Sequence, residues 1–308
     1  MQKKEIMRIT PQIDVMVNHE CNARCGMCIQ EITWKSSTEG DEEFLAGVAR
    51  HFADYHVLGG RKVIITGGEP TLRIRLVLKV LEILKRYSDL DLVAMYTNGS
   101  RLLCQFGGTT IAERLRAADL EFVNLSIHHW EPEKNNAVFC LTKDDPVEVA
   151  RHLREIGQQF RFCATLQKGG LETTTDVIRY LEYAQACGAK SVYFRELFTL
   201  KDVDRESAGR PESVDYATLA FVPVEPIINE CYSHFEKIAE DANFQGRHKR
   251  EVGFCFRDNL PFFFSTLEVG SEEKDELPYL VVMPNGHLYS TWHGEVARIQ
   301  SLINLNIK

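Results

Sequence analysis

The stretch VNHECNARCGMCIQE, residues Val17 to Glu31, places three cysteines within eight positions. Cys21, Cys25 and Cys28 are spaced four and three residues apart and directly follow an apolar stretch. The chain has nine cysteines, an odd number, and we expect a cytoplasmic protein whose thiols stay reduced. Metal binding or catalysis therefore explains the trio better than a disulfide framework does.

Outside this stretch, six short runs rich in β-branched and aromatic residues alternate with amphipathic runs. The six are QIDVMVN (12–18), KVIIT (62–66), LVAMYTN (92–98), FVNLSIH (122–128), FRFCATLQ (160–167) and KSVYFREL (190–197). Helical spacing is found from Pro70 to Tyr87, and another helix is expected from a cap at Thr173 to Gly188. This pattern predicts an α/β fold, a partial (β/α)6 TIM-like barrel with its chemistry at the carboxyl ends of the strands. An open, doubly wound sheet is the alternative.

The last third of the chain differs in kind. We expect residues 1–200 to form the barrel and residues 201–214, which are polar and include Gly209 and Pro211, to form a linker or mobile loop. A helix is predicted from Tyr216 to Ala242, and a hairpin over residues 280–292, with Asn285-Gly286 in a type I′ turn. Residues 215–308 would then be a small α+β extension that covers the barrel mouth.

Charge and hydropathy exclude two classes of partner. With 36 basic and 44 acidic residues, the formal net charge of −8 argues against a nucleic-acid surface. The sequence lacks the run of about 18 apolar residues that a membrane span needs, and its first residues lack the apolar core of a signal peptide. We therefore expect a cytoplasmic protein with no nucleic-acid and no membrane partner.

Three further motifs follow the second, third and fourth apolar runs. TGGEPT, Thr66 to Thr71, contains two glycines that would let the backbone approach a ligand closely, or would simply form the turn into a helix that opens at Glu69-Pro70. YTNGS (96–100) and NLSIHH (124–129) follow in the same way. Because carboxyl ends of parallel strands share one edge of a sheet, all these motifs are expected at one site.

Together, the cysteine trio and these motifs resemble the radical S-adenosylmethionine (SAM) superfamily over residues 13–198. The resemblance implies that Cys21, Cys25 and Cys28 bind three irons of a [4Fe-4S] cluster and leave the fourth iron for SAM. One departure is Met27, where the family usually has an aromatic residue.

The same resemblance implies the cofactor contacts. The residues Gly67, Gly68 and Glu69 would contact the methionyl amino group of SAM. Asn98 and Ser126 would lie near its ribose and carboxylate, although a turn and a strand-end hydrogen bond are the alternatives. Arg195 could pair with the cofactor carboxylate, and a structural salt bridge is the alternative.

The implied activity is that of an oxidoreductase that cleaves SAM reductively and abstracts a hydrogen atom from a small-molecule or peptide substrate. Flavodoxin or ferredoxin would supply the electron. Cys255, expected in the covering segment, is a candidate hydrogen donor for an epimerase. A dehydrogenation or rearrangement would need no thiol donor. Cys255 is otherwise a buried cysteine or the trace of an auxiliary cluster, since the other matching positions are Asp258 and Thr291.

A different class of function stays open at this point. The trio and His19 could hold zinc in a non-catalytic binding module. A structural zinc site would not require the glycine motif, which favours the enzyme.

Overall fold

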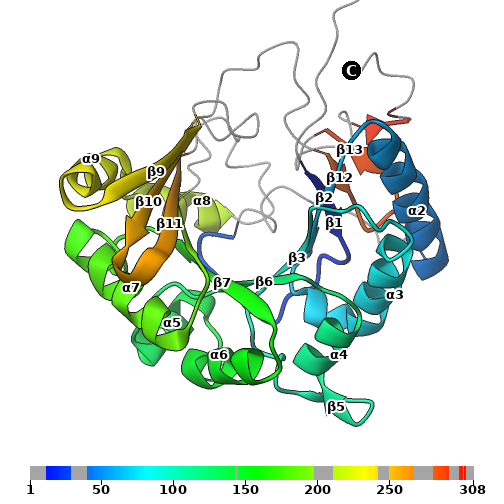
Figure 1. The fold of residues 1–308 in the computed structure, drawn as a ribbon, viewed down its shortest axis with the longest axis horizontal. Helices are drawn as coiled ribbons and strands as arrows, with labels where there is room; N and C mark the ends of the chain where they lie inside the picture. The colour runs from blue at the N-terminus through cyan, green and yellow to red at the C-terminus, as the bar shows by residue number, and fades with distance from the viewer. Residues whose placement is uncertain are drawn as a thin grey trace, which may run out of the picture.

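The computed structural model describes residues 12–28, 40–142, 145–197, 211–241, 250–266, 280–290, 298–300 and 302. Six parallel strands lie side by side in chain order, and each coincides with one of the six predicted runs, although β7 begins one residue earlier, at Gln159. They are β1 (Ile13–Met16), β2 (Lys62–Thr66), β3 (Leu92–Thr97), β6 (Phe122–Ser126), β7 (Gln159–Thr165) and β8 (Val192–Arg195). The sheet curves without closing, so the predicted α/β partial barrel is confirmed (Figure 1).

Strands from the last third of the chain extend this sheet at both edges. β11 (Leu260–Thr266) pairs in parallel with β8, and β12 (Val281–Val282) pairs in parallel with β1. Four antiparallel strands lie beyond them: β10 (Arg250–Phe256) and β9 (Glu236–Asp241) on one side, β13 (Leu288–Tyr289) and β14 (Arg298–Ile299) on the other. The 3-10 turn η2 (Arg257–Asn259) joins β10 to β11.

Helices cover the convex face of the sheet (Figure 1). They are α2 (Asp41–Val57), η1 (Pro70–Arg73) with α3 (Ile74–Leu84), α4 (Ile111–Ala117), α6 (Pro146–Glu155) and α7 (Thr174–Cys187). α5 (Pro132–Phe139) precedes α6, and the short strands β4 (Gln105–Phe106) and β5 (Thr109–Thr110) precede α4. No helix in the described ranges is long and apolar enough to cross a membrane.

Alternation along the strands separates an apolar face from a polar one. Residues such as Val63, Val123 and Phe162 are fully buried and belong to the main hydrophobic core under the helices. Their neighbours along the strands point to the concave face, where Asn124 and Arg161 lie. The helices thus hold the sheet from outside, and the concave face is left for chemistry.

Helix caps explain why α7 begins and ends where the sequence predicts. The Thr173 hydroxyl accepts a hydrogen bond from the Asp176 amide, and the Asp176 carboxylate accepts from the Thr173 amide, which forms a capping box. At the other end Gly188 has φ +79°, a conformation that favours glycine.

Two predictions in the last third were wrong in detail. The single helix over residues 216–242 is instead α8 (Pro211–Leu219), α9 (Glu225–His234) and strand β9. Pro223 lies between the two helices, and Pro226 lies in the first turn of α9, where proline is tolerated. The hairpin is present, but Pro284 leads a turn closed by a hydrogen bond from the Gly286 amide to the Met283 carbonyl. Only Gly286 has positive φ there, so the turn is not type I′. Residues 201–210 of the expected linker lie outside the described residues, and 211–214 are helical.

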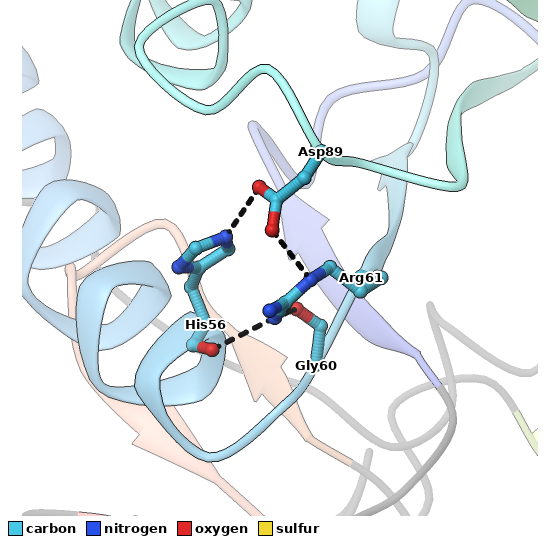
Figure 2. Close-up of polar contacts among 4 residues, drawn as sticks. All are labelled: His56, Gly60, Arg61 and Asp89. Carbon is cyan, nitrogen blue, oxygen red and sulfur yellow. Dashed lines mark hydrogen bonds and ion pairs between the residues drawn. The ribbon is translucent and has the colours of Figure 1, made fainter.

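A polar cluster ties three elements together at the amino ends of β2 and β3 (Figure 2). The Asp89 carboxylate contacts His56 Nε2 at 2.7 Å and Arg61 Nε at 2.9 Å. Arg61 also donates to the His56 and Gly60 carbonyls, both at 2.8 Å. The hydrogen bond from His56, with help from Arg61, lowers the pKa of Asp89. This cluster lies at the end of the sheet opposite the cysteines.

Candidate active site

The cysteine loop after β1 and the glycine turn after β2 are joined along their backbones. The Gly68 amide donates to the Asn18 carbonyl at 2.9 Å, and the Glu69 amide donates to the Glu20 carbonyl at 2.7 Å. The Asn18 side chain, which is buried, donates to the Glu69 carbonyl at 3.1 Å. Two motifs about 40 residues apart therefore form one structural unit at the carboxyl ends of neighbouring strands.

Both glycines are required by contacts within the chain. A Cβ atom at Gly67 would lie 2.2 Å from Asn18 Oδ1, and one at Gly68 would lie 2.2 Å from the Glu20 carbonyl oxygen. Such separations are far below van der Waals contact. The sequence suggested that the glycines make room for a ligand, whereas here they make room for the cysteine loop itself.

The Glu69 side chain is fully buried and engaged with the protein. One carboxylate oxygen accepts hydrogen bonds from the Thr71 amide at 3.0 Å and from the Thr71 and Thr97 hydroxyls at 2.5 and 2.7 Å. The other accepts from the Asn98 amide at 2.7 Å. A buried carboxylate with this many donors is a structural anchor between β2 and β3.

A second network links the cysteine loop to the end of β3. The side chain of Asn22, between the first two cysteines, donates to Ser100 Oγ at 2.8 Å. Asn98 Nδ2 donates to Asn22 Oδ1 at 2.9 Å, and Asn98 Oδ1 accepts from the Ser100 amide at 2.9 Å. Asn98 was predicted from the sequence, whereas Asn22 was missed, because its only signal was its position inside the trio.

The three cysteines are half-buried in this loop, as a metal site open to a ligand requires. The Cys28 amide donates to the Cys25 carbonyl at 3.2 Å, and the Ala23 amide donates to Cys21 Sγ at 3.4 Å. Across the described residues, no three His, Cys, Asp or Glu side chains are arranged to hold a single metal ion. A four-iron cluster does not need that arrangement, because each cysteine would bind a different iron.

Helix α8 packs against the same loop. A Cβ atom at Gly26 would lie 2.6 Å from the Tyr216 ring, and Met27 packs against a small apolar cluster that includes Ala217 and Ala220. Burial, followed by the nearby thiols of Cys140 and Cys25, raises the pKa of Tyr216. An aromatic side chain thus covers the loop even though residue 27 is methionine.

The concave face beside the loop carries charged and polar side chains from several strands. Arg195 hydrogen-bonds the Tyr96 hydroxyl across the face, and its guanidinium lies 4.8 Å from the Tyr96 ring centroid. Arg161 lies 4.4 Å from the Tyr193 ring centroid and donates to Asn124 Oδ1. These contacts make the face basic and aromatic.

Asp14 on β1 is an acidic residue of this face. Burial raises the pKa of its carboxyl to about 7, although the Arg195 charge and the Gln12 side chain act in the opposite direction. Ser126, at the end of β6, is half-buried beside Cys163 in the register of β7. Asp14, Arg161 and Cys163 were missed, although the alternation in FRFCATLQ could have placed the last two on one face.

Cys255 is not brought to this site. It pairs with Pro261 near the start of β11 and with Glu236 of β9. Ser265, near the end of β11, pairs with Arg195 at the carboxyl end of β8. Cys255 therefore lies at the amino ends of the parallel strands, away from the cysteine loop. This placement argues against Cys255 as a hydrogen donor.

Comparison with known proteins agrees with this geometry. The radical SAM superfamily pattern matches residues 15–191. A probable GTP 3',8-cyclase of Thermococcus kodakarensis is 36% identical over 262 residues, which is 82% of this chain and 74% of that protein. A probable GTP 3',8-cyclase of Pyrobaculum aerophilum is 29% identical, covering 67% and 69% of the two chains.

Among solved structures, Streptococcus suis SuiB bound to precursor peptide SuiA superposes with a TM-score of 0.60 at 14% identity. The match covers 93% of this chain and 60% of SuiB, and it shows the shared fold. The zinc-module alternative is overturned by these matches. The chain belongs to the radical SAM superfamily, whose members use a [4Fe-4S] cluster and SAM, and it is a radical SAM enzyme.

Proposed function

We propose that the enzyme abstracts a hydrogen atom from a purine nucleotide, with GTP as the first candidate, and that the product is a cyclised isomer of that nucleotide. The similarity to GTP 3',8-cyclases over 82% of the chain supports the substrate. A cyclisation replaces the epimerisation considered from the sequence, because the relatives that match most of the chain are named GTP 3',8-cyclases.

Cys21, Cys25 and Cys28 would hold the cluster in this proposal. When bound, the reduced cluster and SAM supply a 5′-deoxyadenosyl radical at the carboxyl ends of the strands. The glycine turn and the Asn22–Asn98 pair keep the loop in place. Flavodoxin or ferredoxin would deliver the electron, and no nucleic acid or membrane is involved.

The observation that carries the substrate class is the state of Arg161. Its guanidinium is partly buried between aromatic rings, and within the described residues no carboxylate lies at ion-pair distance from it. A buried cation is normally paired. In a chain of net charge −8, such a group is suited to the phosphates or carboxylate of an anionic substrate.

The test is an anaerobic assay of the reconstituted enzyme with GTP that carries deuterium at C3′. We expect deuterium in the 5′-deoxyadenosine and a product with the mass of unlabelled GTP, because the deuterium removed from C3′ is replaced by one hydrogen. Arg161→Gln should raise the KM for GTP on the order of 10- to 100-fold, since a charge-assisted hydrogen bond contributes about 1.5–3 kcal/mol, while Arg161→Lys should recover part of it.

ATP under the same conditions is the control for the base. Absence of deuterium transfer from GTP would contradict the proposal. A peptide substrate, the other class expected from the sequence, would then be tested in its place.

A further inference from the structure

We propose that Cys163 is the hydrogen-atom donor of this enzyme: its thiol, on the concave face of β7, returns a hydrogen atom to the substrate radical. The two neighbours of Cys163 along the strand, Phe162 and Ala164, belong to the core under the helices, so Cys163 faces the opposite way. The cysteine is 5% exposed and pairs in register with Ser126 and Tyr193.

The surroundings of Cys163 are those of a reaction site. The side chain of Tyr96 and the guanidinium groups of Arg161 and Arg195 are close enough to the thiol to lower its pKa. Despite both cations, burial dominates and raises the pKa of Cys163. The group therefore keeps the S–H bond that a hydrogen-atom donor needs.

A second observation indicates that this face binds a ligand. Asn124, on the adjacent strand, is 0% exposed; its Oδ1 accepts from Arg161, but its Nδ2 has no hydrogen-bond partner in the described part of the chain. A buried amide nitrogen without an acceptor is costly, and a bound substrate oxygen would satisfy it. Arg161 and Asn124 thus place a ligand on the same face as the thiol.

Hydrogen transfer from Cys163 breaks one bond and forms one bond. The S–H bond of Cys163 breaks, a bond from its hydrogen to the substrate radical forms, and a thiyl radical is left on sulfur. One electron and one proton restore the thiol; the electron comes from the one-electron donor, a flavodoxin or ferredoxin, that also reduces the enzyme. Ring closure of GTP needs such a hydrogen because one was removed before the new bond formed. An epimerisation would need one too, so the inference does not depend on the proposed substrate.

The test needs no substrate. The reconstituted enzyme is exchanged into deuterated, thiol-free buffer and reduced with dithionite in the presence of SAM, so that Cys163 carries S–D. A radical formed next to this thiol takes its deuterium, and we expect 5′-deoxyadenosine with one deuterium from the wild type. Cys163→Ser should lose that label while keeping the wild-type iron content and SAM affinity, measured by equilibrium dialysis.

Cys255→Ser is the matched control. Because Cys255 lies at the amino ends of the parallel strands, its substitution should leave the label unchanged. Cys163→Ala gives a second variant in case serine disturbs the strand. If both Cys163 variants bind SAM and still yield labelled 5′-deoxyadenosine, the donor role is overturned. This outcome is separate from the GTP assay, which can fail while the label behaves as expected.

Discussion

Gly68 lies directly against the backbone of Glu20, so close that a methyl group in place of its hydrogen would stand 2.2 Å from the Glu20 carbonyl oxygen. The turn after β2 therefore acts as a template for the loop that carries Cys21. Even Gly68→Ala should displace this loop and break the backbone hydrogen bonds that join it to the glycine turn. We therefore expect iron per chain after reconstitution to fall by more than half.

Iron analysis and the visible absorption spectrum of the variant give the measurement. The sequence suggested that the two glycines let the backbone approach a ligand closely, and on that view a larger residue at position 68 would block SAM and spare the cluster. Normal iron content with weakened SAM binding would support that earlier view against the structural one.

Asn22→Ala removes two hydrogen bonds that tie the cysteine loop to β3. Each such bond contributes about 0.5–1.5 kcal/mol, so the loop should open more often without changing the global fold. We expect faster loss of iron to a chelator and an unchanged urea midpoint. Ser100→Ala removes only one of these bonds and should lie between the variant and the wild type.

Glu69→Gln tests whether this carboxylate is a structural anchor. The glutamine NH2 group would face N–H or O–H groups of Thr71, Thr97 or Asn98 that now donate to the carboxylate. At least one of these donors would lose its acceptor. We expect the free energy of unfolding to fall by about 2–4 kcal/mol. Urea unfolding of the apo protein gives this value independently of SAM. A stable variant that fails only to bind SAM would instead make Glu69 a cofactor ligand.

Asp14 should make stability depend on pH. Its pKa of about 7 in the folded state lies above the ordinary value of 3.8 for an aspartate, so as pH rises the unfolded chain loses this proton first. The contribution of this group to the free energy of unfolding therefore decreases from about pH 4 to pH 7 and is constant above. Asp14→Asn removes this effect and should gain stability relative to the wild type on going from pH 5 to pH 8, by on the order of 2–4 kcal/mol.

Asp89 provides the comparison of opposite sign. Its pKa is lowered, mainly by the hydrogen bond from His56, so its stabilising effect is present at neutral pH and is lost as pH falls (Figure 2). Asp89→Asn should therefore lower stability at pH 8. The iron content should not change, because Asp89 and its polar partners lie at the end of the sheet opposite the cysteines. The same direction of change for both variants would contradict the assignment for Asp14.

Much of the barrel could be predicted because its signals are local. The six strands and α7 follow from apolar runs, the Thr173 cap and Gly188, and parallel pairing then places Cys21 beside Gly68. The roles of the glycines and of Glu69 could not be predicted, since they depend on which atoms of the two loops meet.

The last third shows the limit of sequence patterns more clearly. The position of Cys255 depends on β10 running antiparallel to β11, a pairing that no local pattern specifies. β12 is two residues long, and its pairing with β1 joins segments more than 260 residues apart. Such contacts are determined by the assembled sheet rather than by the short segments themselves.

The two parallel strands that flank the six barrel strands, β11 and β12, lie late in the chain. During translation, β1 and β8 emerge from the ribosome long before residues 260–282 do, and until then both are exposed sheet edges with unpaired amide and carbonyl groups. Until β11 and β12 are synthesised, the nascent chain therefore has two unpaired edge strands, which makes it prone to aggregation. Chaperone dependence in the cell, and insolubility of a chain shortened to residues 1–200, are the consequences we expect from this order of synthesis.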